Sequence, residues 1–306
     1  MTHEPVLLSE VMRLLEPNRP DGVIVDATVG LGGHAEALLE RHSEVRLIAI
    51  DRDPEALERS RVRLSRFPGR VTFVGGRHES LIDILKQCGT ERISGLLADL
   101  GVSSMQLDDA ARGFSFRFEG PLDMRMGSEG RSAADLVNEL DEWELMRIIR
   151  EYGEEPMARR IAAAIVAARV EEPITTTAKL AEVIRGVKKA RYHEIDPSTL
   201  TFQALRIATN EELIGLDRFV DDAVSVLENG ARVGIIAFHS LEDRIVKRAF
   251  RRLAGECTCP PNMPVCGCGA TQSVKVLTGR PVTASEEEMQ RNPRSRSAKL
   301  RVAERV

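Results

Sequence analysis

The sequence lacks any long apolar run: nowhere in its 306 residues does one approach the roughly 20 apolar residues that a membrane-spanning helix needs. The first twenty residues interrupt their apolar stretches with Glu4, Glu10, Arg13 and Glu16, so we expect no secretory signal. Five cysteines are too few for a disulfide scaffold in a chain of this length. These absences predict a cytoplasmic protein without a membrane partner.

An excess of charge of one sign is also missing. The formal net charge is −4. This charge argues against a protein that coats nucleic acid, but it allows a local basic groove. Apolar residues make up 42% of the chain, more than a disordered protein would have at so low a net charge. Aromatic residues are scarce at 4%, so two Phe in one polar loop are noticeable.

The first hundred residues alternate short apolar runs with amphipathic stretches. The runs predict strands at 23–25, 47–50, 71–74 and 96–98. Helices are expected between them, at 35–41, 54–65 and 80–87. Strands and helices in this order build a doubly wound α/β domain with a parallel sheet.

The strand pattern stops in the middle of the chain and returns later. Residues 110–204 predict an inserted helical domain, with helices at 142–151, 156–170 and 177–189. After residue 202 we expect a helix that ends at Gly230. Strands are then expected at 233–238, 273–277 and 299–303, with a helix at 241–252 after the first of them. The α/β domain is therefore predicted to be discontinuous, comprising residues 1–109 and 205–306.

A glycine-rich turn follows the first expected strand, from Asp26 to His34. Its glycines permit positive φ and let a ligand approach the backbone, and the next helix offers free N–H groups. Asp51 ends the second strand, where a carboxylate can accept both ribose hydroxyls of an adenosine. The combination predicts a site for an adenosine-containing ligand.

Two ligand classes fit this turn. Gly30 and Gly32, with Ala35 three residues later, satisfy the pattern of a nicotinamide dinucleotide site, so a dehydrogenase is carried as an alternative. S-adenosyl-L-methionine is the other candidate, because acids at several strand ends can hold its amine and adenine. Asp26 would repel a pyrophosphate close to the turn, and this favours S-adenosyl-L-methionine.

Asp99 follows the fourth expected strand and should face the same site. The loop beyond it mixes aromatic and basic side chains, notably Phe114, Phe116 and Arg125. Aromatic faces interleaved with arginine suit a stacked base beside a phosphate backbone. The alternative is an aromatic anchor that ties the insert to the core.

Several long blocks resemble one known family, the bacterial 16S ribosomal RNA cytosine-N4-methyltransferases. They extend from His3 to Arg301 and read HEPVLLSEV, DATVGLGGHA, AIDRDPEAL, LADLGVSSMQLDDAARGFSF, GPLDMRM, GEE, TFQALRI, FHSLEDRIVKR and NPRSRSAKLR. The resemblance implies a class I (Rossmann-like) S-adenosyl-L-methionine methyltransferase fold with a helical insertion. It also implies methylation of a decoding-centre cytidine, cytidine 1402, in the rRNA of the small ribosomal subunit, and no DNA substrate.

The resemblance also places the methyl-donor contacts. They fall on seven residues: Gly32, Gly33, His34, Asp51, His78, Asp99 and Gln106. His78 departs from the family, in which an aromatic residue such as Phe is common at this position. Many amino-methylating enzymes carry an acid or Asn followed by Pro-Pro-aromatic after strand four, and this chain has Asp99-Leu100-Gly101-Val102 instead.

The transfer itself requires the cytosine N4 in line with the donor methyl, and a proton must leave. Asp123 and His239 are our candidates for handling the amino group. Each has a structural alternative: Asp123 could pair with Arg125, and His239 could cap the helix that starts near Leu241.

Contacts to RNA should come from local basic clusters. One cluster lies on the expected helix at 241–252, one in the insert, which includes Arg191, and one near the C-terminus, which includes Arg294. We favour the C-terminal cluster and the Phe114–Arg125 loop as the groove, with the target base unstacked to reach the donor. A noncatalytic ribosome assembly factor is the alternative from another class, and a homodimer is left open.

Four cysteines are closely spaced near the C-terminus: Cys257, Cys259, Cys266 and Cys268. Their spacing allows a structural zinc site, but reduced thiols are the usual state in a cytoplasm. We therefore assign no metal to the chain.

Overall fold

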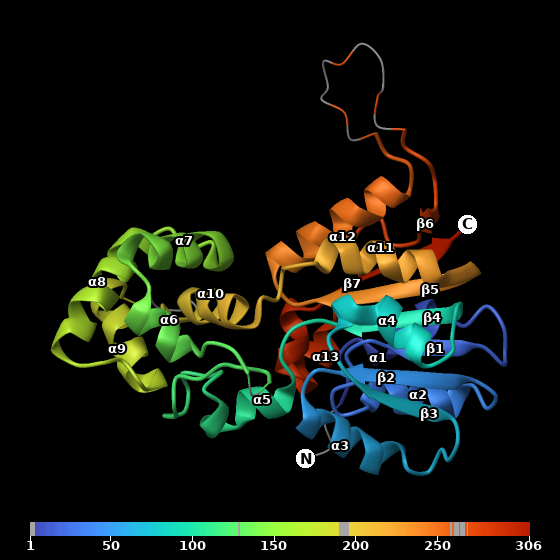
Figure 1. The fold of residues 1–306 in the computed structure, drawn as a ribbon, viewed down its shortest axis with the longest axis horizontal. Helices are drawn as coiled ribbons and strands as arrows, with labels where there is room; N and C mark the ends of the chain where they lie inside the picture. Colours follow the sequence, from blue (N-terminus) through green and yellow to red (C-terminus); the bar gives the residue numbers. More distant parts are fainter. Residues whose placement is uncertain are drawn as a thin grey trace. The chain divides into compact units, whose positions relative to one another are not determined.

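The structure is a computed structural model, and it describes residues 4–127, 129–189, 196–257, 259, 263, 267 and 269–306. The chain divides into two compact units, as the colours of Figure 1 show along the sequence. The first unit combines Met1–Gly101 with Ile214–Val306, and the second is Val102–Leu213. The expected insert, residues 110–204, lies within the second unit.

A seven-stranded sheet forms the centre of the first unit, in the order β3-β2-β1-β4-β5-β7-β6. The strands are β1 (Val23–Asp26), β2 (Arg46–Asp51), β3 (Val71–Gly75), β4 (Ile93–Asp99), β5 (Leu227–Ala237), β6 (Val274–Val276) and β7 (Lys299–Arg305). All seven correspond to predicted strands, although β5 begins at Leu227, before the expected start at 233. This α/β sheet confirms the expected class I fold.

The sheet is mixed rather than wholly parallel. Strands β3, β2, β1, β4 and β5 are parallel to one another, as predicted. β7 is antiparallel to both β5 and β6, which we did not predict. An antiparallel strand needs no crossover helix, so nothing in the spacing of hydrophobic residues reveals its direction.

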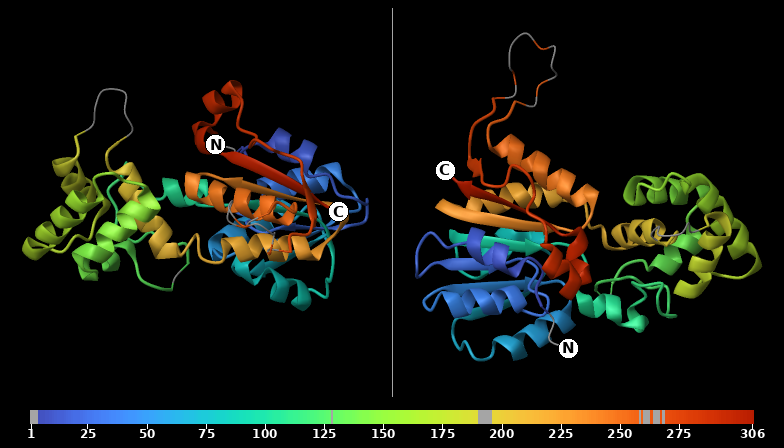
Figure 2. Two further views of the ribbon diagram at one scale, coloured as in Figure 1. Left: turned by 90° about the horizontal axis from the view of Figure 1, so that it is seen from above. Right: turned by 180° about the vertical axis from the view of Figure 1, so that it is seen from behind.

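Helices cover both faces of this sheet (Figure 2). On one face lie α1 (Leu8–Leu14), α2 (Gly33–Arg41) and α3 (Pro54–Leu64). The other face carries α4 (Leu81–Gln87), α11 (Leu216–Val226) and α12 (Ser240–Leu253), and α13 (Glu286–Arg291) precedes β7. The central strands β1 and β4 are buried on both sides, which explains their continuous apolar runs.

Local sequence signals explain where several of these helices begin and end. Asp53 caps α3 by accepting from the N–H of Glu55, and Pro54 occupies the first helical position. The expected helix end at Gly230 is wrong: α11 ends at Val226, and Gly230 lies within β5 with φ 82°. Glycine tolerates that backbone in a strand as well as after a helix, so the residue alone does not distinguish the two.

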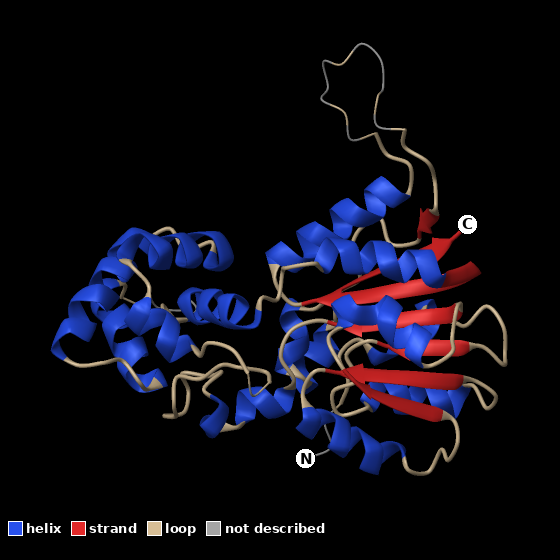
Figure 3. Cartoon of the chain, viewed as in Figure 1, coloured by secondary structure: helices blue, strands red, loops and turns tan. Residues whose placement is uncertain are grey.

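The second unit is helical, and Figure 3 draws no strand within its described residues. Its helices are α5 (Ser104–Asp108), α6 (Ala133–Glu139), α7 (Glu142–Gly153), α8 (Ala158–Glu171), α9 (Thr177–Val187) and α10 (Thr199–Asn210). Ser132 and Asp141 start α6 and α7 with capping boxes. A core of its own, including Ile149, Ile161 and Leu205, holds the unit together.

Candidate functional site

Three aspartates stand at the carboxyl ends of three neighbouring strands of the first unit. Asp26 ends β1, Asp51 ends β2 and Asp99 ends β4, and these strands are adjacent in the sheet order β2-β1-β4. The carboxyl end of an open parallel sheet is where ligands bind in α/β folds. The glycine-rich turn leaves from the same edge, so the predicted acids and turn come together here.

The backbone of the turn holds Asp51 in place. The N–H of Gly30 donates to its Oδ2 at 2.8 Å, and the N–H of Asp53 donates to its Oδ1 at 2.9 Å. Each carboxylate oxygen therefore keeps a lone pair for a further donor. Burial raises the pKa of Asp51 despite these two hydrogen bonds.

Asp26 is buried and Asp99 is half-buried, and both have fewer hydrogen-bond partners than Asp51. Asp26 is 2% exposed and accepts from the N–H of Thr28 at 3.2 Å; burial raises its pKa to about 7. Burial, with Asp26 and Glu242 nearby, raises the pKa of Asp99 well above its ordinary value. The Oδ1 atom of Asp99 is buried and has no hydrogen-bond partner among the described residues.

The helix that begins at the turn places His34 beside Asp99. Nε2 of His34 donates to the carbonyl of Val6 at 2.8 Å, and its Nδ1 lies 3.9 Å from Oδ2 of Asp99. Gly33 is required here because a Cβ at this position would lie 2.4 Å from Cγ of Pro5. Gly32 has φ 76° and caps α2 without a side chain, so the first N–H groups of the helix stay accessible to a ligand.

The acids of this edge are not neutralised. Within the described residues, no Lys or Arg pairs with Asp26, Asp51 or Asp99. A buried carboxylate without a cation is costly, and the raised pKa values express that cost. Such a cluster favours a ligand that brings hydroxyl or ammonium donors and disfavours a pyrophosphate.

His78 follows β3, next along the same edge. It starts a short 3-10 turn, His78–Ser80, and its ring meets Phe219 edge to face with centroids 4.7 Å apart. Its Nε2 is buried without a hydrogen-bond partner in the described part of the chain, and burial lowers the pKa of the ring. His78 therefore presents a neutral ring.

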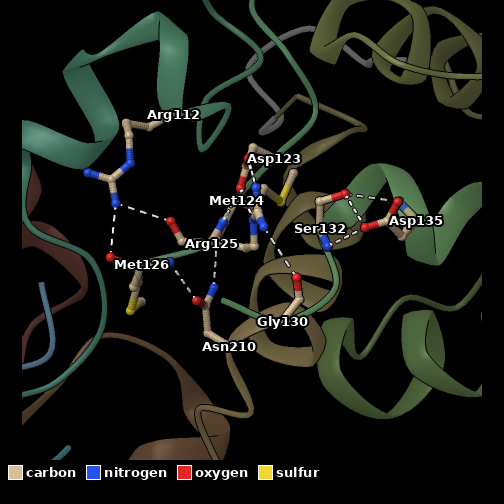
Figure 4. A network of polar contacts seen from close by, with 9 residues as sticks. All are labelled: Arg112, Asp123, Met124, Arg125, Met126, Gly130, Ser132, Asp135 and Asn210. Atoms are coloured by element: carbon tan, nitrogen blue, oxygen red, sulfur yellow. Dashed lines mark hydrogen bonds and ion pairs between the residues drawn. The ribbon is translucent and has the colours of Figure 1, made fainter. Parts of the chain in front are cut away.

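The second unit holds a separate polar network around Asp123 and Arg125 (Figure 4). Oδ1 of Asp123 accepts from Nε of Arg125 at 2.8 Å and Oδ2 accepts from Nη2 at 2.7 Å, and this pairing lowers the pKa of Asp123. Met124 between them has φ 61°, a left-handed conformation that its side chain disfavours.

Asn210 clamps this strained segment from α10. Its Nδ2 donates to the carbonyl of Met124 at 2.7 Å, and its Oδ1 accepts from the N–H of Met126 at 2.8 Å (Figure 4). Arg112 adds two hydrogen bonds to the carbonyls of Arg125 and Met126. The network fixes the backbone on both sides of Arg125; sequence reasoning missed Asn210, because a lone Asn at a helix end carries no signal of its own.

Comparison with known proteins places the chain in a family. Residues 1–306 match the profile described as "MraW methylase family". The chain is 53% identical to a Ribosomal RNA small subunit methyltransferase H of Pelobacter propionicus, over 99% of this chain and 98% of that protein. A protein of the same name from Geobacter sulfurreducens is 51% identical, over 100% of this chain and 99% of the other.

The chain belongs to the MraW methylase family. This is a family of class I methyltransferases whose methyl donor is S-adenosyl-L-methionine. The open acids of the first unit agree with that donor, and the nicotinamide alternative finds no support. Within the described residues, no helix is long and apolar enough to cross a membrane.

Two predicted substrate contacts of this methylase lie mainly in the core of the second unit. Phe114 is 6% exposed, and Phe116 packs edge to face on Phe202 with centroids 5.1 Å apart. Both rings therefore pack within the core of the second unit itself. Gln106 lies on α5, buried, and its Oε1 accepts from the N–H of Ser103.

The other predicted residues of the methylase occupy mostly local roles. His239 caps α12: its Nδ1 accepts from the N–H of Glu242 at 3.4 Å, and Nε2 lies 3.1 Å from Oε1 of Glu242 without hydrogen-bond geometry. Arg294 is half-buried in the 3-10 turn Pro293–Ser297. Cys266, Cys268 and Arg191 lie outside the described residues.

Proposed function

We propose that this chain transfers a methyl group from S-adenosyl-L-methionine to the N4 amino group of cytidine 1402 in 16S ribosomal RNA. The observation that carries the proposal is the set of buried, unneutralised acids at the ends of β1, β2 and β4, in a chain that belongs to a methylase family. The names of relatives about 50% identical over the full chain support the rRNA substrate.

The residues fit the donor on chemical grounds. Asp51 offers two oxygens oriented by the N–H groups of Gly30 and Asp53, suited to the two ribose hydroxyls. Asp99 has an orphaned buried oxygen, which calls for a strong donor such as the ammonium of the methionine part. His78 offers an uncharged ring for the adenine. Gly32 and Gly33 have no side chain, so the donor can approach the backbone of the turn. When bound, the donor supplies an electrophilic methyl group.

The remaining task is to position the amino group and remove one proton. We keep Asp123 and His239 as the candidates for this task. Asp123 is ionised and held by Arg125, so it can accept a hydrogen bond from the amino group but is a weak base. His239 keeps Nε2 buried without a hydrogen bond in the described part of the chain. Comparing the pH–rate profiles of Asp123→Asn and His239→Gln tests which residue takes up the proton.

The function is tested with methyl-labelled S-adenosyl-L-methionine and small ribosomal subunits from cells that lack the protein. Nuclease digestion and nucleoside mass analysis should find the label in N4-methylcytidine. Label on the ring carbon or on a ribose oxygen would contradict the proposed position of methylation. Binding of the donor without any transfer would favour the noncatalytic assembly factor instead.

The same experiment addresses the finer proposals. We propose the assembled small subunit, in the cytoplasm, as the substrate, and parallel assays with naked 16S rRNA test that choice. Sedimentation of the active protein shows whether it works as a homodimer. DNA carrying the same sequence serves as a negative control, because we propose no DNA substrate.

A further inference from the structure

Phe118 differs from the two phenylalanines that precede it in the same loop. It is 52% exposed, whereas Phe114 is 6% exposed and Phe116 packs on Phe202. Among the aromatic residues that the structure describes, only Phe118 and Trp143 expose more than half of their surface. An exposed ring costs about 25 cal/mol for each Å² of apolar surface left in water, so its position requires a reason.

The backbone beside Phe118 is held by a buried threonine. Oγ1 of Thr177 donates to the carbonyl of Phe118 at 2.9 Å and accepts from the N–H of Gly120 at 3.1 Å. The N–H of Thr177 in turn donates to the carbonyl of Gly120 at 3.0 Å. Thr177 has no exposed surface, so water does not compete for these bonds.

The chain is also packed too closely here for the loop to shift. A Cβ on Gly120 would lie 1.8 Å from the carbonyl oxygen of Ala110, and one on Gly113 would lie 2.0 Å from that of Pro121. The exposed ring of Phe118 is therefore attached to a rigid segment of backbone. A rigid aromatic ring loses little entropy when a partner binds it.

Trp143 shows what an exposed ring with an internal partner looks like. It lies on α7, and the guanidinium of Arg147, one turn later, stacks over its ring at 5.9 Å. Phe118 has no ring or cation partner among the described residues. Its neighbour Arg117 is exposed and forms no ion pair there, and exposed Glu119 offers an acceptor for a base amino group.

We propose that Phe118 is the stacking platform for one unpaired base of the RNA substrate, with Arg117 beside it for the phosphate backbone. The proposal rests on the proposed function and adds a specific contact to it. A target base must leave its stack to reach a methyl donor, and stacking on an aromatic ring replaces part of the lost stacking energy. Each such contact is worth about 1–3 kcal/mol.

The test compares Phe118→Ala, Phe118→Leu and Phe118→Trp with the wild-type chain. Affinity for the small subunit and for a decoding-centre RNA fragment is measured, along with kcat and KM for methyl transfer. We expect Phe118→Ala and Phe118→Leu to weaken RNA binding and raise KM by about 5- to 150-fold, as 1–3 kcal/mol requires. Phe118→Trp should bind at least as well as wild type, and kcat should change less than KM.

Trp143→Ala is the matched control, because it removes a more exposed aromatic ring from the same unit. It should leave KM and RNA affinity unchanged. Equal binding by Phe118→Leu and wild type would overturn stacking in favour of simple apolar contact. A change in oligomeric state with unchanged RNA affinity would make Phe118 part of an interface between copies of the chain.

Failure of this proposal is distinguishable from failure of the proposed function. If wild type methylates cytidine N4 and all Phe118 variants match it, only the stacking role is overturned. If wild type transfers no methyl group, RNA affinity still reports on Phe118. Thermal unfolding and donor affinity should not change in any variant, because the ring is exposed and lies outside the acids that hold the donor.

Discussion

Aspartates have opposite environments in the two units, and their pKa values shift in opposite directions. In the first, no Lys or Arg pairs with Asp26 or Asp99 among the described residues, and the pKa values of both are raised. In the second, Asp123 pairs with Arg125 and Asp135 accepts from Ser132, and both pKa values are lowered. Ionising these two acids is therefore unfavourable in the free first unit, and a cationic ligand would relieve that cost. The second uses its acids to fix its own backbone, and a ligand has no charge to relieve there.

Removing the charge of Asp99 should give the largest effect and test this contrast directly. Asp99→Asn keeps the shape but removes a carboxyl group that no Lys or Arg pairs with among the described residues. We expect donor affinity to fall by about 30- to 1000-fold, the usual range of 2–4 kcal/mol for losing one partner of a buried charge pair. The free protein should be no less stable, because a costly buried carboxylate is gone.

Asp123→Asn is the matched control for that prediction. It leaves Arg125 without its carboxylate. Because this ion pair is partly exposed, we expect the loss of stability to stay below about 1 kcal/mol. Donor affinity should not change. Calorimetric titration with the donor and thermal unfolding measure both variants. A loss of stability in Asp99→Asn with normal donor binding would reverse the assigned roles.

Breaking a hydrogen bond between Asn210 and the Met124–Met126 segment should give the next largest effect, on stability and on kcat. Asn210→Asp keeps the acceptor for the N–H of Met126 but loses the donor to the carbonyl of Met124. Leaving this buried carbonyl unpaired should cost about 1–3 kcal/mol of stability and lower kcat for methyl transfer.

Asn138 offers a control with the same bonding pattern. Its Nδ2 donates to the carbonyl of Ile174 and its Oδ1 accepts from the N–H of Ile174, and it makes no hydrogen bond to Met124 or Met126. Asn138→Asp should lose comparable stability in chemical denaturation but keep kcat at folded-protein concentration. If both variants lose activity in proportion to stability alone, Asn210 has no positioning role.

The smallest effect concerns pH. The pKa of Asp26 is raised from 3.8 to about 7, so its protonated form is favoured in the folded protein. The free protein should therefore lose stability as pH rises from about 4 to 7, where the unfolded chain ionises first. A cationic donor favours the carboxylate, so donor affinity should rise by up to about tenfold between about pH 6 and 8. Asp26→Asn should flatten this dependence, and a flat wild-type titration would contradict it.

Sequence patterns predicted the elements with strong periodicity and the acids at strand ends, because both depend on local order along the chain. They did not predict the direction of β7, which depends on a pairing with β5 across the sheet. The exposure of Phe118 was also missed. Phe114, Phe116 and Phe118 alternate in one loop, and only the core built by Phe202 and its neighbours determines which rings are buried.

The hydrogen bond from the N–H of Leu7 to Oε1 of Glu288, 2.7 Å long and buried, has a consequence for synthesis of the chain. The segment that packs Pro5 on Gly33 is synthesised well before its anchor, because Leu7 and Glu288 are 281 residues apart in the chain. At about 5–20 residues per second, tens of seconds separate the two. The glycine-rich turn from Asp26 to His34 thus acquires this support only after Glu288 has been synthesised, so chains truncated before Glu288 should not retain the donor.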